Sequence, residues 1–293
     1  MRPSGRTFGG SYNEYSKSSN ARLGELRHHR RELQPARSFL VCSAYGTALS
    51  GKQDRRAYHA GSYGDQTGGG NRNKKVFARG AGWPLDRFSR VERVCEGGIV
   101  VCIASGPSLN TEQVERVFQA RQEKLVRVIA VNDTYQMAPF ADVCYFADTK
   151  WWHWHKERED FKAFAGEKCT IFTTGNLVDD PNVHMLRRAE RDGLSLDPAA
   201  ICTGANSGHQ AVNIAALTGA KRIVLLGYDA KPGTKGRRHY FGDHPDRTSA
   251  PYHEMIIAFR AIQKLLGEIE VLNATPGSAV DAFKKVSLEE ALS

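Results

Sequence analysis

Short apolar runs alternate with stretches of helical periodicity from Gly98 onward, and this alternation limits the folds that the chain can adopt. Ile99–Ile103, Val126–Val131 and Arg222–Leu226 are nearly continuous apolar runs, which is typical of strands buried on both faces. Further strands are predicted at Val143–Ala147, Cys169–Phe172 and Ile269–Leu272, and helices at Thr111–Glu123, Ser207–Ala220 and Pro251–Leu266. The pattern predicts an α/β fold with a doubly wound, mostly parallel, Rossmann-like sheet.

The first 90 residues differ in composition from the rest of the chain. They carry 17 Lys and Arg against 6 Asp and Glu, a net +11, whereas the remaining residues carry 24 against 26, a net −2. They are rich in Gly and Ser and poor in apolar clusters, so little buried surface offsets the entropy of ordering. We expect residues 1–90 to be a basic, poorly ordered extension, with transient strands at most in segments such as Ser38–Tyr45. Residues 96–293 are expected to form one Rossmann-like domain.

A basic extension of this kind either binds polyanions such as nucleic acid weakly or is simply solvated. Six cysteines lie apart without the CxxC spacing of metal sites: Cys42, Cys95, Cys102, Cys144, Cys169 and Cys202. Several fall in apolar runs, where a reduced Cys behaves as a small hydrophobic residue, and a reducing compartment fits best. No apolar run approaches the roughly 20 residues of a membrane span, and the first residues lack the apolar core of a signal peptide. A cytoplasmic protein is expected.

In a doubly wound sheet, ligands bind at the carboxyl ends of the strands, so residues that directly follow a strand are candidates. Ser105-Gly106-Pro107-Ser108 follows the first predicted strand. Gly106 allows a ligand to approach the backbone, and Ser108 can cap the next helix and leave amides for a phosphate. An ordinary strand–loop–helix turn explains the same residues.

Polar residues also follow the next two predicted strands. Asn132 offers a donor and an acceptor to a base or ribose, and Asp133 stands beside it. Asn and Asp are also common in turns, so an ordinary turn explains the two residues equally well. Asp148 can accept from a ribose hydroxyl, hold Mg²⁺ or cap a helix.

Three tryptophans follow Asp148 in the segment WWHWH at 151–155. They can stack on a base or a sugar, but the favoured interpretation is that they pack a helix onto the sheet with the histidines at its rim. His153 and His155 are two residues apart and so do not share a helical face, which argues against zinc.

Two later segments suit phosphate or ribose oxygens. Thr203–Gly208 places Gly204, Asn206, Ser207 and Gly208 at the start of a predicted helix, where backbone amides and the helix dipole favour anions. Capping alone explains Ser207 but not the whole run. Tyr228 and Asp229 end the strand at Arg222–Leu226; the tyrosine can bond a phosphate, and the aspartate can orient a partner or a cation.

A long polar segment follows at residues 231–249, long enough to suggest a lid. It contains His239, Tyr240 and His244. A loop histidine titrates near neutral pH and is a natural general base, although a solvated surface histidine is the plainer explanation.

Taken in order, these segments resemble the bacterial sialyltransferases of glycosyltransferase family 42. That family has a strand followed by G-N-G-P-S-L, a strand ending C-N-Q-F-Y, a Ser-Gly helix start, a strand ending G-x-D, and an H-Y-[IV]-G-H loop. This chain has ASGPSL at 104–109, VNDTY at 131–135, NSGHQ at 206–210, GYD at 227–229 and HYFGDH at 239–244. LNATPGS at 272–278 is similar to the family's C-terminal L-x-x-x-x-P-x-S element.

The resemblance implies a CMP-linked donor held by Gly106, Pro107, Ser108, Asn132, Ser207 and Gly208. It implies that His244 is the catalytic base, if Asp243 is an insertion, and that Tyr228 or Tyr240 assists the departing phosphate. The chain departs from the family at Ser105 and Asp133, where the family has asparagine and glutamine. It also has Asp148 or Thr149 where the family offers an amide to the nucleotide.

The Gly-Pro-Ser-Leu segment also resembles the MptE-like pterin diphosphokinase family, whose matching strands end in aspartates. Asp148 and Asp229 fit that family, since diphosphate transfer from ATP needs Mg²⁺ held by carboxylates. Phage and prophage genomes carry many small proteins of this shape, which implies a place in the cytoplasm of a bacterial host.

Three hypotheses therefore stand. The first is a metal-independent glycosyltransferase that uses a nucleotide-sugar donor, with His244 as base and an acceptor that the sequence does not identify. The second is a Mg²⁺-dependent diphosphotransferase with Asp148 and Asp229 on the metal. The third is a non-enzymatic nucleotide-binding or phage-assembly module whose basic tail contacts DNA or a partner.

Overall fold

The computed structural model of the chain describes residues 38–42, 88–123, 126–171, 178, 180–242 and 251–293. Most of the predicted extension, residues 1–37 and 43–87, lies outside these ranges, and so do His244 and the rest of residues 243–250.

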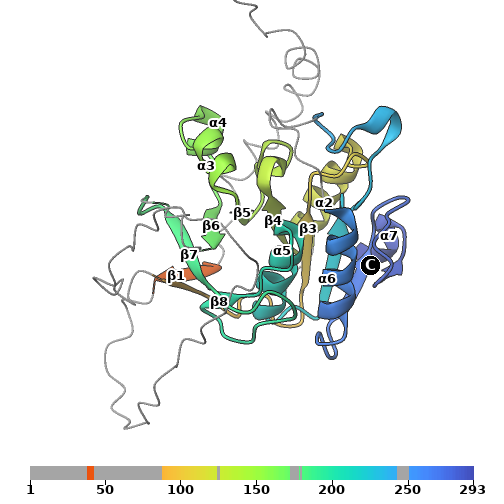
Figure 1. Ribbon diagram of the computed structural model, residues 1–293. Helices are drawn as coiled ribbons and strands as arrows, with labels where there is room; N and C mark the ends of the chain where they lie inside the picture. Colours follow the sequence, from red (N-terminus) through yellow and green to blue (C-terminus); the bar gives the residue numbers. More distant parts are fainter. Residues whose placement is uncertain (1–37, 43–87, 124–125, 172–177, 179, 243–250) are drawn as a thin grey trace, which may run out of the picture.

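A nine-stranded sheet forms the centre of the molecule (Figure 1). Its strand order is β11-β10-β9-β3-β4-β5-β6-β7-β8, and every neighbouring pair is parallel. The strands are β3 (Ile99–Ile103), β4 (Val126–Val131), β5 (Val143–Phe146), β6 (Glu167–Ile171), β7 (Val183–Arg188), β8 (Ala200–Ile201), β9 (Arg222–Leu226), β10 (Glu270–Asn273) and β11 (Lys284–Lys285). The predicted doubly wound α/β fold is confirmed.

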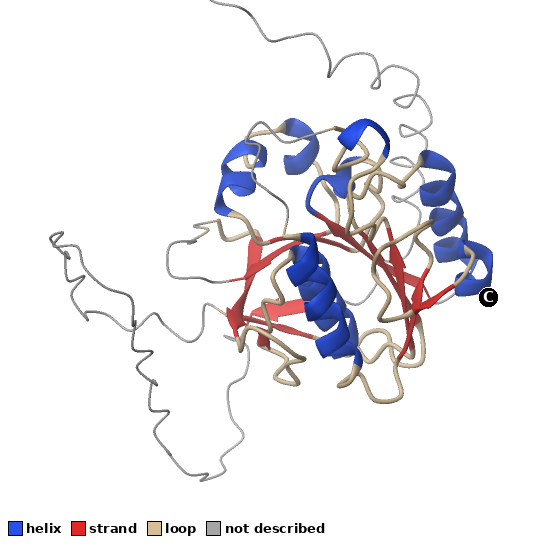
Figure 2. Ribbon diagram, turned by 45° about the vertical axis from the view of Figure 1, so that its right-hand side comes forward, coloured by secondary structure: helices blue, strands red, loops and turns tan. Residues whose placement is uncertain are grey.

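Helices cover both faces of the sheet. They are α2 (Thr111–Glu123), α3 (Thr149–His155), α4 (Glu159–Lys162), α5 (Ser207–Leu217), α6 (Tyr252–Gln263) and α7 (Leu288–Leu292), with 3₁₀ turns η4 (Asn132–Gln136) and η5 (Thr234–Gly236). One core cluster joins the sheet to α2, α3 and α7, and a second joins it to α5 and α6. Figure 2 shows α5 lying across one face. Nearly all residues of α5 are buried, as expected of a helix that is apolar on almost every side.

The chain order reverses at the middle of the sheet. From β3 the strands run in sequence through β4 to β8, and the chain then returns through α5 to β9 on the other side of β3. The carboxyl ends of β3 and β9 are therefore the topological switch point, where open α/β sheets bind ligands.

A small antiparallel ladder packs against the face that carries α5. β1 (Leu40–Cys42) pairs with β2 (Ser89–Val91), and Phe39 and Leu40 are 2% and 1% exposed within the second core cluster. This short part of the predicted extension thus contributes to the core of the domain.

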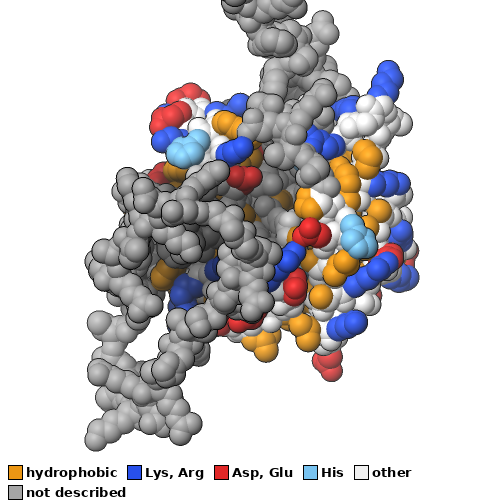
Figure 3. All heavy atoms as spheres, in the orientation of Figure 1, with side chains coloured by type: hydrophobic (Ala, Val, Ile, Leu, Met, Phe, Trp, Pro, Cys, Tyr) orange, Lys and Arg blue, Asp and Glu red, His pale blue; other side chains and the backbone are white. Residues whose placement is uncertain are grey.

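On the face of the molecule that Figure 3 shows, acidic and basic side chains of the described residues are interspersed.

The tryptophan segment forms α3, and the favoured interpretation of it is confirmed for two of its members. Trp151 and Trp152 are buried against Phe146, whereas Trp154 is 39% exposed. The expectation that the histidines line the rim is wrong for His155, which is 5% exposed, because its ring stacks on Trp151 with centroids 4.0 Å apart.

Strand β7 was not predicted, because its pattern is not that of a doubly buried strand. Of its six residues only Val183, Met185 and Leu186 are buried, and the strand ends in Arg187 and Arg188. β8 and β11 have two residues each, too few for a periodic signal. Among the described residues, no helix is both long and apolar enough to cross a membrane.

Candidate functional site

The loops that follow β3 and β9 are bonded to each other at the switch point. The Gly106 amide donates to the Gly227 carbonyl over 2.9 Å. The Ser108 amide and hydroxyl donate to the two carboxylate oxygens of Asp229, over 3.2 and 2.9 Å. We call these three bonds the switch-point clamp.

Gly106 is required by the switch-point clamp. A Cβ at this position would lie 1.9 Å from Oδ2 of Asp229 and 2.4 Å from the Gly227 carbonyl oxygen. Burial raises the pKa of Asp229 above its usual value, and the bonds from Ser108 partly counter the shift. Both oxygens of a carboxylate predicted to face a ligand are thus bonded within the protein.

The start of α5 presents unbonded amides. Asn206 precedes the helix in an extended conformation, and its side chain accepts from the His209 amide over 2.8 Å. The amides of Ser207 and Gly208 have no hydrogen-bond partner among the described residues. Such amides at the positive end of a helix form a ready site for an anion.

Two rings hold this helix start in place. The Tyr228 ring lies against Gly208, and its hydroxyl donates to the Gly208 carbonyl over 3.1 Å. His209 is fully buried, and a Cβ on Gly204 would come within 2.0 Å of its imidazole. Burial lowers the pKa of His209 to about 4. The imidazole is therefore neutral at physiological pH.

The end of β4 contributes a residue in an unusual conformation. Asn132 has a φ of 54°, a left-handed conformation that Asn tolerates better than most residues. Its Oδ1 is buried and has no hydrogen-bond partner among the described residues. Asp133 turns inward instead, where it accepts from the Trp151 indole over 2.9 Å and lies 3.3 Å from Nε2 of His155. Asp133 thereby anchors α3.

The segment after β9 returns to the ends of β3 and β4. Nδ1 of His239 lies 2.9 Å from the Ser105 hydroxyl, and the Tyr240 amide donates to the Ser105 carbonyl over 3.0 Å. The Tyr240 hydroxyl donates to the Asp133 carbonyl over 3.2 Å. His239 is thus placed at the first predicted turn. His244 lies outside the described residues, and its role as base stays a prediction.

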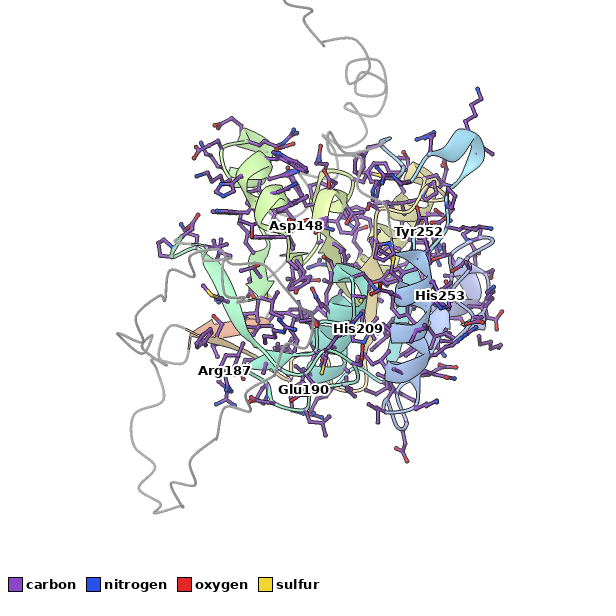
Figure 4. The ribbon with its side chains drawn as sticks, viewed as in Figure 1. Asp148, Arg187, Glu190, His209, Tyr252 and His253 are labelled. Carbon is purple, nitrogen blue, oxygen red and sulfur yellow. The ribbon has the colours of Figure 1, made fainter. Side chains whose placement is uncertain are left out.

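Two adjoining cavities of about 560 and 160 Å³ open at this edge of the sheet and share Asn132, Asn206, Ser207 and Met255. We call them the large and the small cavity. The small cavity brings together most of the predicted residues: Ser105, Gly106, Pro107, Asn132, Asn206, Ser207, Gly208, Tyr228, Asp229 and His239. Asp148 lines the large cavity, and its Oδ1 caps α3 by accepting from the Lys150 amide over 3.0 Å. Figure 4 shows Asp148 at the start of α3 and Tyr252, which lines the small cavity, at the start of α6.

Four predicted residues do not line either cavity: Ser108, Asp133, Gly204 and Tyr240.

Residues with a strained backbone conformation do line the cavities. Asn132, Ala205 and Ala230 all line a cavity and are three of the four described residues other than glycine with positive φ. Residues are held in such conformations chiefly at functional sites, because the surrounding structure must offset a cost of roughly 1–3 kcal/mol each.

Several lining residues were not among the predicted site residues: Arg188, Arg191, Gln210, Lys231, Arg238 and Met255. Lys231 and Arg238 stand in the polar segment that was singled out for its histidines. Arg188 ends β7 and Arg191 follows it three residues later, and this strand was not predicted. The Arg187-Arg188 pair is a signal that could have located the first of the two. Within the described residues, no group of three or more His, Cys, Asp or Glu side chains could hold a metal ion.

No protein-family model matches the chain, and no curated protein matches it. Among solved structures, it is similar to the sialyltransferase CstII from Campylobacter jejuni, determined in complex with a substrate analogue, cytidine-5'-monophosphate. The superposition has a TM-score of 0.41 at 13% sequence identity and covers 64% of this chain and 84% of that chain. A similarity of this extent does not assign a function to the chain.

Proposed function

We propose that the chain is a transferase of the glycosyltransferase type that uses a nucleotide-linked donor at the two cavities. One observation carries the proposal: the ends of β3, β4 and β9 and the start of α5 converge on the small cavity, where two helix amides have no partner among the described residues. This arrangement suits a phosphorylated ligand at the switch point of the sheet.

In this proposal the phosphate of the donor binds the Ser207 and Gly208 amides. Lys231 and Arg238 line the same cavity and add positive charge for the phosphate. Asn132 lies between the two cavities, and its unpartnered Oδ1 accepts from the base or the ribose.

The reaction we propose needs no metal. A histidine takes the proton of an acceptor hydroxyl, whose oxygen attacks the anomeric carbon of the donor sugar. The bond from that carbon to the phosphate oxygen breaks, and the nucleotide leaves with the electron pair. The amides at the start of α5 stabilise the charge that develops on the leaving phosphate. His244 is proposed as the base, and His239 supports the turn at Ser105.

A Mg²⁺-dependent diphosphotransferase is the alternative enzyme. It would need Asp148 and Asp229 as metal ligands. Asp229 already accepts two bonds from Ser108, and Asp148 caps α3. Ser108 already engages both oxygens of Asp229, which leaves this carboxylate less able to bind a metal and favours the metal-free reaction.

The test is a thermal-shift screen of the full chain against CMP, UDP, GDP, ATP and pterins, each with Mg²⁺ and with EDTA. We expect a nucleotide to raise the melting temperature by mass action, equally in both conditions. Stabilisation that requires Mg²⁺ would favour the diphosphotransferase. The absence of stabilisation by any nucleotide would reject the proposed function.

A matched variant separates binding from stability. Ser207→Asp places a negative charge at the first residue of α5, where it stabilises the helix but repels a phosphate. The variant should keep the melting temperature of the unliganded protein and lose the shift caused by nucleotide.

The variant His244→Gln tests the base. Hydrolysis of the donor in the absence of acceptor should be slower in this variant than in the parent protein. Unchanged turnover in this variant would reject His244 as the base. Nucleotide binding without turnover in the parent protein would leave a binding module.

A further inference from the structure

The large cavity is lined by a cation that is not paired with an anion of the described residues. Arg188 is the last residue of β7, is exposed, and lines this cavity. Its guanidinium has no hydrogen bond or ion pair within the described part of the chain. Arg191 lines the same cavity, but its guanidinium is paired with Glu254 over 2.7 Å.

The segment that carries these arginines is fastened to the loop that leads into α5. The Thr203 amide donates to the Glu190 carbonyl over 3.1 Å, and the Gly204 amide donates to the Arg191 carbonyl over 2.7 Å. Arg188 and Ser207, whose amide is assigned above to a phosphate, line the same cavity. Figure 4 shows Glu190 and Arg187 on this segment.

Arg187 offers a built-in contrast. Successive side chains of a strand point to opposite faces. Arg187 does not line the large cavity and is paired with Asp197 over 2.6 Å. Two adjacent arginines thus differ in one respect: one has its anion within the protein, and the other faces a cavity.

The remaining charge on the lining does not neutralise Arg188. Among the described residues of the lining, Asp148 is the one acidic residue, and it lies beyond 4.0 Å of Arg188, since no ion pair joins them. An arginine guanidinium binds carboxylates and phosphates through paired hydrogen bonds, and this geometry selects oxyanions over neutral groups.

We propose that the large cavity is a second subsite that binds an oxyanion of a substrate through Arg188. The proposal rests on the proposed function, because it concerns the ligand that lies beside the donor phosphate. The oxyanion is either a second phosphate of the donor or an acid group on the acceptor. Both present the same oxygen atoms to the guanidinium.

Isothermal titration calorimetry of the full chain tests this with two pairs of probes. The first pair compares a nucleoside monophosphate with its diphosphate, for cytidine, uridine and guanosine. The second compares galactose with galacturonate at matched ionic strength. We expect one pair to show tighter binding of the ligand with the extra oxyanion, and Arg188→Gln to remove about tenfold of that preference. Arg187→Gln should keep it, and both variants should melt as the parent protein does.

The outcomes separate the inference from the function beneath it. Diphosphate preference lost in Arg188→Gln identifies the donor as the source of the oxyanion, and lost galacturonate preference identifies the acceptor. If monophosphates bind but neither preference depends on Arg188, the inference is overturned and the proposed function stands. If no nucleotide binds while galacturonate still depends on Arg188, the proposed function fails and the oxyanion subsite stands. An equal loss of the oxyanion preference in Arg187→Gln and Arg188→Gln would also overturn the inference.

Discussion

Gly106 lies where the loops after β3 and β9 come closest together, and any side chain there collides with the switch-point clamp. In Gly106→Ala the Cβ would meet Asp229 Oδ2 at 1.9 Å, so the two loops must separate. We expect a loss of about 1–3 kcal/mol in the free energy of unfolding, and loss of nucleotide stabilisation. Urea unfolding and the thermal-shift screen measure the two effects.

Gly97→Ala is the control. Gly97 has a φ of 70°, and a Cβ added to it would meet nothing within 4 Å, so the substitution strains the backbone without touching the cavities. It should cost about 1 kcal/mol and leave nucleotide binding intact. If Gly106→Ala binds nucleotide as Gly97→Ala does, the switch-point clamp has no part in the site.

His209 should make stability depend on pH. Its pKa is about 4 in the folded protein, against about 6.5 in an unfolded chain. Between these values only the unfolded chain binds the proton, so stability is complete above about pH 6.5 and falls as the pH drops towards 4. The full loss is about 3 kcal/mol. Urea unfolding from pH 7 to pH 4.5 measures it.

His209→Gln removes the titrating group and should flatten this part of the pH profile. His253→Gln serves as the control, because His253 is exposed on α6 and its loss should leave the profile unchanged. A profile that is as steep in His209→Gln as in the parent would contradict the assignment.

At the scale of elements, Asn213 ties α5 to the β7–β8 connection and to the residue that follows β8. It is fully buried, its Oδ1 accepts from the Ser195 and Cys202 amides over 3.0 Å each, and its Nδ2 donates to the Ser195 carbonyl over 2.9 Å. Asn213→Ala leaves three buried backbone groups unpaired, and we expect a loss of about 3 kcal/mol or more in unfolding free energy.

Asn110→Ala is the matched control for this prediction. Asn110 is exposed and caps α2 through the Gln113 amide, so its loss should cost about 1 kcal/mol. Equal costs for the two variants in urea unfolding would mean that the bonds of Asn213 do not hold the elements together.

Strands could be predicted from the sequence where a continuous run of apolar residues indicated that the strand is buried. β3, β4 and β9 are apolar along their length and were predicted with the bounds that the structure has. β7 lies near the edge of the sheet and ends in arginines, so its sequence carries no continuous apolar signal. As a result, two residues that line the large cavity, Arg188 and Arg191, were not predicted either.

At the scale of the whole molecule, the cysteines report on global unfolding. Cys95, Cys102, Cys144, Cys169 and Cys202 are free and buried. Burial raises the pKa of Cys95 to about 11 and that of Cys102 to about 12, so little thiolate forms at neutral pH. We expect these five thiols to react with a disulfide reagent only as the protein unfolds. Time courses of the reaction with and without urea measure this. Cys42 is not among these five thiols, so one fast-reacting thiol per chain is allowed. Rapid reaction of more than one thiol in the native protein would contradict the prediction.

The sequence by itself determined the α/β class and the candidate turns, because apolar periodicity and the rule that ligands bind at strand ends are local properties. The tertiary structure decided which polar side chains are bonded inside the protein and which face a cavity. Asp133 and Asp229 have the same chemistry in the sequence, yet one anchors α3 and the other joins two loops. Arg187 and Arg188 are neighbours, yet only one is paired within the described residues. Ser108 and Asp229 are 121 residues apart in the chain, and only folding brings such partners together.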